Sequence, residues 1–122
     1  MRLPTFAAAA TALVFLGLSG TAQAQQKFDG RWSVLLETEK GECDKAYRYP
    51  IAIENGVVRY AGDAGFDVTG KVASNGSVQG SVTSGQTRAN VKGRLAGSSG
   101  SGTWTISGSR NCSGSFSAEK RG

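Results

Sequence analysis

The chain of 122 residues contains no histidine, and Met1 is its one methionine. Without histidine the protein lacks the usual general base, the Ser-His and Cys-His nucleophile pairs, and the commonest ligand of zinc and haem iron. Without a methionine inside the folded part, only tyrosine remains as a ligand for haem iron. We therefore predict that the protein is not an enzyme and that it holds no metal ion and no cofactor.

Helical periodicity is also absent. No stretch shows apolar residues at positions i, i+3, i+4 and i+7, whereas apolar and polar residues alternate along almost the whole chain after the first two dozen residues. This alternation predicts an all-β fold, an antiparallel up-and-down meander of about eight short strands. Asn55-Gly56 and Asn75-Gly76 separate such stretches and favour tight hairpin turns.

Glycine-rich phosphate loops are lacking too, because the glycines fall at turns or at inward strand positions and none begins a helix. Nucleotide cofactors are therefore not expected. Five glycines share the expected inner face, and they either make room for large aromatic side chains or leave a cavity for a ligand. These glycines are Gly70, Gly80, Gly93, Gly102 and Gly114.

The beginning of the chain has the features of a secretory signal peptide. Arg2 precedes an apolar stretch over residues 6–18, and the small-residue sequence Ala-Gln-Ala follows at residues 22–24. We expect residues 1–24 to be removed and residues 25–122 to form a single domain, periplasmic or secreted. A retained anchor is the alternative, but the apolar stretch is about a dozen residues long and a membrane-spanning helix needs roughly 20. No later segment is apolar enough to span a membrane.

The net charge of +5 is modest, and the basic residues are spread along the chain, so nucleic-acid binding is not expected. Arg88, Lys92 and Arg94 alternate along one expected strand and would form a basic, hydroxyl-rich stripe with polar residues of the neighbouring strands. Such a stripe either contacts an anionic surface or only keeps the protein soluble and its strands from pairing with other chains.

Cys43 and Cys112 are the two cysteines, and in an exported chain two cysteines most often form a disulfide; a free reactive thiol is the alternative. In an up-and-down meander, the first loop, with Cys43, lies at the same end as the seventh loop, with Cys112. A closed barrel makes the first and last strands neighbours, so the disulfide would join the two hairpins that meet at the seam. We therefore predict a small closed barrel, with a two-sheet β-sandwich as the alternative.

The segment Phe28-Asp29-Gly30-Arg31-Trp32 resembles the Gly-x-Trp start of the calycin barrels, which include lipocalins, avidins and small secreted inhibitors of bacterial metalloproteases. In lipocalins the tryptophan closes one end of the barrel beneath an arginine from near the last strand. The resemblance implies that Arg121 stacks on Trp32.

Over nearly the whole chain after residue 24, the sequence is similar to a group of small exported alphaproteobacterial proteins of unassigned function. The Phe-Asp-Gly-x-Trp start and both cysteines carry this similarity, together with segments 43–49, 100–104, 112–114 and 118–121. Members are sometimes labelled haem-utilisation or adhesion exoproteins, and the lack of histidine does not support the haem role here.

These observations favour a non-enzymatic exported binding module whose partner is a small ligand, an envelope glycan or a protein. The candidate ligand-binding residues are Tyr47 and Tyr49 at the barrel mouth, with Trp32 and Trp104. One alternative is a secreted protease inhibitor that inserts residues 25–28 into an enzyme. Another is an envelope or adhesion component that acts through the basic stripe.

Overall fold

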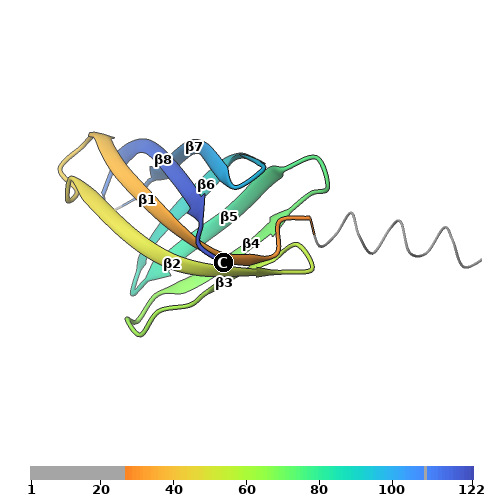
Figure 1. The fold of residues 1–122 in the computed structure, drawn as a ribbon. Helices are drawn as coiled ribbons and strands as arrows, with labels where there is room; N and C mark the ends of the chain where they lie inside the picture. Colours follow the sequence, from red (N-terminus) through yellow and green to blue (C-terminus); the bar gives the residue numbers. More distant parts are fainter. Residues whose placement is uncertain (1–26, 109) are drawn as a thin grey trace, which may run out of the picture.

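The computed structural model describes residues 27–108 and 110–122, which form one closed barrel of eight antiparallel strands (Figure 1). The strands follow one another around the ring in chain order, so the predicted meander and its closure are confirmed and the β-sandwich alternative is wrong. The strands are β1 (Gly30–Lys40), β2 (Ala46–Glu54), β3 (Val57–Tyr60), β4 (Asp67–Val72), β5 (Ser77–Ser84), β6 (Thr87–Ala96), β7 (Ser99–Ile106) and β8 (Cys112–Lys120).

The predicted signal peptide, residues 1–24, lies outside the described residues. In the part of the chain that the structure does describe, no helix is long and apolar enough to cross a lipid bilayer.

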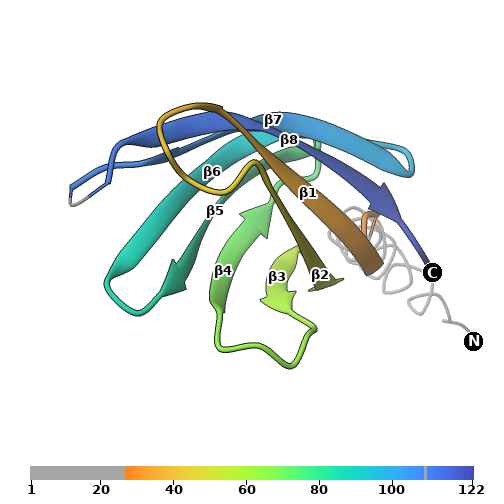
Figure 2. The ribbon, with the colours of Figure 1, turned by 90° about the vertical axis from the view of Figure 1, so that its left-hand side faces the viewer.

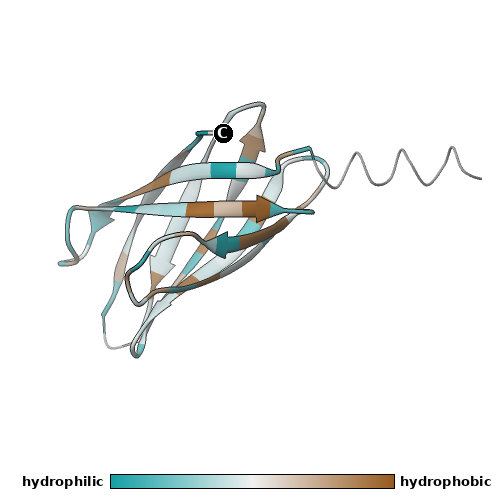
Figure 3. Ribbon diagram, turned by 60° about the horizontal axis from the view of Figure 1, so that its bottom comes forward, coloured by the Kyte–Doolittle hydropathy of each residue, from teal (hydrophilic) through white to brown (hydrophobic). Residues whose placement is uncertain are grey.

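The strands form because their apolar residues alternate with polar ones, so that one side of the ribbon is buried when it curls. Figure 3 shows the resulting apolar patches within otherwise polar or neutral strands. The predicted turn between β2 and β3 is confirmed: Asn55 and Gly56 both have positive φ angles, 51° and 76°, as a type I′ hairpin turn requires.

The barrel closes between β1 and β8, which pair from Trp32 opposite Lys120 to Lys40 opposite Ser113. The predicted disulfide joins Cys43 to Cys112 beside this seam, with their Cα atoms 6.2 Å apart. Because both hairpins of the seam are thereby linked covalently, the closure does not depend on backbone hydrogen bonds alone. The disulfide is consistent with folding in an oxidising compartment.

The two ends of the barrel differ. The β1–β2, β3–β4, β5–β6 and β7–β8 loops lie at the left-hand end in Figure 1, which carries the disulfide and which Figure 2 views directly. We call this the disulfide end. The β2–β3, β4–β5 and β6–β7 turns lie at the opposite end, where the chain enters β1.

Residues 28 and 29 close that opposite end. Phe28 is 5% exposed, and its carbonyl oxygen accepts a hydrogen bond of 2.9 Å from the indole Nε1–H of Trp32, which is 1% exposed. The Asp29 carboxylate accepts hydrogen bonds from the backbone N–H groups of Asn55 and Gly56, at 2.9 and 3.4 Å. The start of the described chain is therefore fixed to the β2–β3 turn, and Phe28 becomes part of the core.

Arg121 does not stack on Trp32, so that expectation is wrong. Its guanidinium pairs with the Glu119 carboxylate at 3.1 Å, and the Arg121 side chain is 56% exposed. The physical reason is strand alternation: Ala118 points into the barrel, so Glu119 and Arg121 share the outward side, whereas Trp32 points inward. Among the described residues, the cation–π contact at this end is that of Lys27 over the Phe28 ring, at 5.6 Å.

The inward glycines serve both expected purposes. A Cβ atom at Gly93 or Gly102 would overlap the Phe116 ring, and one at Gly114 would lie 3.0 Å from Trp104 Nε1, so these three glycines make room for large aromatic side chains. Gly70 and Gly80 instead line a small cavity, described below. The interior is thus filled in one region and hollow in another.

Candidate functional site

A hollow of about 370 Å³ lies inside the disulfide end of the barrel. All four loops of that end, or the strand residues next to them, contribute to its wall. Its lining residues are Leu36, Tyr47, Tyr49, Phe66, Val82, Ser84, Thr87, Ala89, Trp104, Ile106 and Arg110. Ser84 and Arg110 are exposed, so the hollow opens to solvent. Its volume lies in the lower part of the range of small-molecule sites, about 300 to 1,000 Å³.

One wall of the hollow is aromatic. Tyr47 and Tyr49 are two residues apart on β2 and therefore point to the same side, with their ring centroids 6.2 Å apart and their planes at 22°. Phe66, from the β3–β4 loop, packs edge-on against Tyr49 with a centroid distance of 4.9 Å. Tyr60 also packs edge-on against Phe66, with a centroid distance of 5.7 Å. These contacts hold the rings as one apolar surface that flat ligands can stack against.

The Tyr49 phenol remains protonated at neutral pH. Its burial, together with the nearby Tyr47 and Tyr60, raises the pKa of Tyr49 above its ordinary value, because a phenolate would be poorly hydrated there and would face two further phenols. Tyr49 therefore brings a neutral hydroxyl group to the hollow, which can donate a hydrogen bond.

Trp104 presents only apolar surface to the hollow. Its indole Nε1–H is shared between the backbone carbonyl oxygens of Glu37 and Ser115, each at 3.1 Å. Because the one donor of the ring is already bonded and the position of the ring is fixed from both sides of the seam, Trp104 offers a rigid apolar face.

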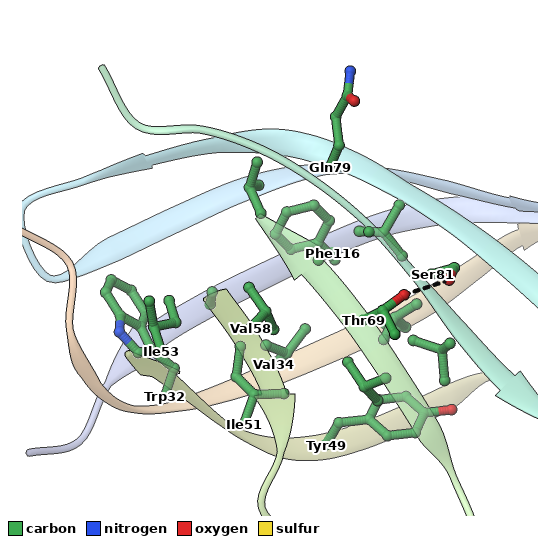
Figure 4. Close-up of a pocket in the computed structure, with 18 of the residues that line it drawn as sticks. Trp32, Val34, Tyr49, Ile51, Ile53, Val58, Thr69, Gln79, Ser81 and Phe116 are labelled. Carbon is green, nitrogen blue, oxygen red and sulfur yellow. Dashed lines mark hydrogen bonds between the residues drawn. The ribbon is translucent and has the colours of Figure 1, made fainter. Parts of the chain in front are cut away.

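The structure brings three of the four predicted ligand-binding residues together, namely Tyr47, Tyr49 and Trp104. Trp32 lies towards the closed end and does not line the hollow. Trp32 instead lines a second cavity of about 70 Å³, shown in Figure 4. The Gln79 side chain points away from this cavity, and the hydroxyls of Thr69 and Ser81 form a hydrogen bond of 3.0 Å with each other. The surface of that smaller cavity is almost entirely apolar.

Of the lining residues that the sequence did not assign to a site, Arg110 and Phe66 bear most on binding, as the charged group and as part of the aromatic wall. Arg110 lies in the β7–β8 loop, with its Nη1 atom 4.0 Å from Cys43 Sγ. Its place two residues before Cys112 was the available signal, because the predicted disulfide already fixed that loop at the rim of the mouth. No sequence pattern indicated that Phe66 would meet Tyr49.

The predicted basic stripe lies on the outside of the barrel. Arg88, Lys92 and Arg94 are all exposed on β6, and Gln79 and Thr103 flank Lys92 on β5 and β7. A surface depression of about 440 Å³ lies along these strands, lined by Ser77, Val78, Gln79, Lys92, Gly93, Gly102 and Thr103.

The inhibitor hypothesis concerns residues 25–28. Gln25 and Gln26 lie outside the described residues, Lys27 is exposed, and Phe28 is buried in the core. A segment anchored at Phe28 leaves only the residues before it for insertion into an enzyme.

Within residues 27–108 and 110–122, no three or more acidic or cysteine side chains are grouped as metal ligands would be. Comparisons with protein-family models, with curated proteins and with solved structures gave no match for this chain.

Proposed function

We propose that this protein is a non-enzymatic, exported binding module that takes a small molecule into the hollow at the disulfide end. The observation that carries the proposal is the asymmetry of the barrel. Phe28 and Asp29 close one end, whereas the other end keeps a solvent-connected hollow of about 370 Å³ with an aromatic wall. If the interior served stability alone, larger apolar side chains in the hollow would make the fold more stable, since each buried methylene contributes about 0.8 kcal/mol.

The chemistry of the lining supports binding without catalysis. Its polar groups are the hydroxyls of tyrosine, serine and threonine and one guanidinium, and the chain has no histidine to activate any of them. The disulfide and the expected signal peptide support export to the periplasm or beyond.

The proposal is tested by native mass spectrometry of protein purified from the export compartment of its own host. A co-purifying small molecule is expected on the unmodified protein and absent from Ala89→Trp and Thr87→Trp, because both residues line the hollow and a tryptophan there would fill it. Thr87 is only half-buried, so its variant tolerates the larger side chain without repacking the core. Asn90→Trp is the matched control, since it places the same side chain on the outer face of β6. Repeated absence of any bound molecule from the unmodified protein would contradict the proposal.

A second candidate function is contact between the basic stripe and an anionic envelope glycan. The observation that favours it is that the outward residues of β5, β6 and β7 include no carboxylate, although they include Arg88, Lys92 and Arg94. Apart from Ala96, hydroxyl and amide side chains occupy the remaining outward positions of these three strands, and such groups hydrogen-bond readily to sugars.

Charge reversal tests this second function. Arg88→Glu, Lys92→Glu and Arg94→Glu combined should weaken association with the host's envelope fraction on the order of a hundredfold, since each cation contributes about 1 kcal/mol near an anionic surface. The matched control reverses three exposed arginines on the opposite strands β1 to β3, Arg31, Arg48 and Arg59. Equal effects of the two triple variants, or no effect of the first, would dismiss this function.

A further inference from the structure

We infer that the hollow at the disulfide end binds a compact aromatic carboxylate, with Arg110 as the residue that binds its anionic group. This inference rests on the proposed function, because it names the class of ligand for the same hollow. It depends on the charge at the mouth, on the donors inside and on the shape of the aromatic wall.

Among the described residues, Arg110 is the one charged residue that lines the hollow. The ion pairs of the described residues join Arg59 to Glu54 and Arg121 to Glu119, so neither involves Arg110. The disulfide lies beside it, with Nη1 4.0 Å from Cys43 Sγ, and sulfur is a weak acceptor. The guanidinium therefore has donors to spare at the point where a ligand would enter.

The other polar groups of the hollow are hydroxyls that can donate a hydrogen bond to an anion. Tyr49 keeps its proton because burial disfavours the phenolate, so it adds no negative charge that would compete for Arg110. Ser84 and Thr87 bring hydroxyl groups at the β5–β6 turn, on the same rim. With a cation and several hydroxyls and no carboxylate in the lining, the hollow is electropositive and disfavours a cationic ligand.

The β5–β7 side of the barrel adds no negative charge that would weaken this potential. The chain has no acidic residue between Val68 and Ala118, the stretch that supplies β5, β6 and β7 and hence the wall on which Val82, Ala89 and Ile106 lie. The acidic residues of the disulfide end lie on the other side of the barrel and are exposed: Glu42 and Asp44 on the β1–β2 loop, Asp63 on the β3–β4 loop and Asp67 at the start of β4. No carboxylate on β5, β6 or β7 therefore reduces the positive potential that Arg110 creates in the hollow.

The aromatic side chains of the lining determine which ligand shape fits the hollow. Tyr47, Tyr49 and Phe66 form a continuous wall, and the Trp104 ring adds a further rigid face. A flat aromatic ring packs against such walls more closely than a branched aliphatic group does. An aromatic ring with one carboxylate matches both the wall and the cation, since Arg binds a carboxylate through two parallel hydrogen bonds.

The test compares 2-naphthoate with its uncharged isostere 2-naphthamide, by isothermal titration calorimetry on the disulfide-bonded protein at low salt. The unmodified protein should bind naphthoate roughly tenfold more tightly than naphthamide, the effect of one partly exposed charge-assisted contact. Arg110→Gln should remove this preference by weakening naphthoate alone. Arg110→Lys should retain part of it, because lysine keeps the charge but not the paired hydrogen bonds. Arg88→Gln, which removes the same charge from the outer face, should change neither affinity.

Equal binding of the two probes to the unmodified protein, or an undiminished preference in Arg110→Gln, would overturn the inference. If naphthamide binds and Ala89→Trp abolishes that binding, the hollow is still a binding site and only the ligand class is wrong. If neither probe binds, the ligand class is again wrong, and native mass spectrometry decides separately whether the hollow holds another molecule.

Discussion

Replacing both Cys43 and Cys112 by alanine is expected to lower the free energy of unfolding by about 4 kcal/mol. The disulfide closes a loop with a sequence separation of 69, and in the chain-entropy model a crosslink of that length restricts the unfolded state by about this amount. For a domain of this size each kcal/mol corresponds to roughly 4 to 8 °C, so the melting temperature should fall by roughly 15 to 30 °C. Thermal unfolding followed by circular dichroism measures the change.

The control for this prediction is the unmodified protein after reduction, which loses the crosslink but keeps both sulfur atoms. Because the two cysteines are buried, the alanine variant also leaves small voids and should be slightly less stable than the reduced protein. The denaturant m-value should rise in both, since the unfolded chain becomes more expanded. A melting temperature within about 3 °C of the oxidised protein would show that β1–β8 pairing alone maintains closure.

Gly114→Ala is expected to destabilise the protein by about 3 kcal/mol, as severe overpacking does. The added Cβ would overlap the backbone carbonyl oxygen of Glu37 on the neighbouring strand β1 and would lie 3.0 Å from Trp104 Nε1. That carbonyl already accepts the Trp104 hydrogen bond, so it cannot move without loosening both the seam and the wall of the hollow. Chemical denaturation measures the loss.

Gly65→Ala is the matched control for Gly114→Ala. Gly65 lies in the β3–β4 loop, a Cβ there would meet no atom within 4 Å, and its φ angle is not positive. The same change of one methyl group should therefore alter stability by less than about 0.5 kcal/mol. If both variants lose equal stability, the crowding at the seam is not the cause.

Most of the fold could be predicted from local pattern. Alternation specified which residues point inward, because a strand has a side-chain period of two and an amphipathic ribbon buries its apolar side. Asn55-Gly56 specified a turn because both residues need positive φ angles there. The seam was predictable for a different reason: the positions of Cys43 and Cys112 are compatible with an up-and-down ring, in which β1 and β8 are neighbours.

The site could be predicted only in part. Tyr47 and Tyr49 were recognisable as residues of the mouth, since they begin the inward set of β2 next to the loop of Cys43. The parts played by Phe66 and Arg110 were not, because both lie in loops, where no periodicity fixes the direction of a side chain. The disulfide indicated where the loop of Arg110 lies, but not where its side chain points. The error over Arg121 arose because a family resemblance was applied against strand alternation, which places that residue outward.

By itself, the sequence determined the all-β class, the inward and outward faces, the sulfur link at the seam and the absence of histidine chemistry, since each of these follows from residue type and spacing along the chain. The tertiary structure alone decided which end of the barrel is closed and which is hollow. That distinction depends on contacts around the ring between residues far apart in sequence, such as Asp29 with the β2–β3 turn and Arg110 with Cys43. Local periodicity does not encode how the loops at each end fold over the opening.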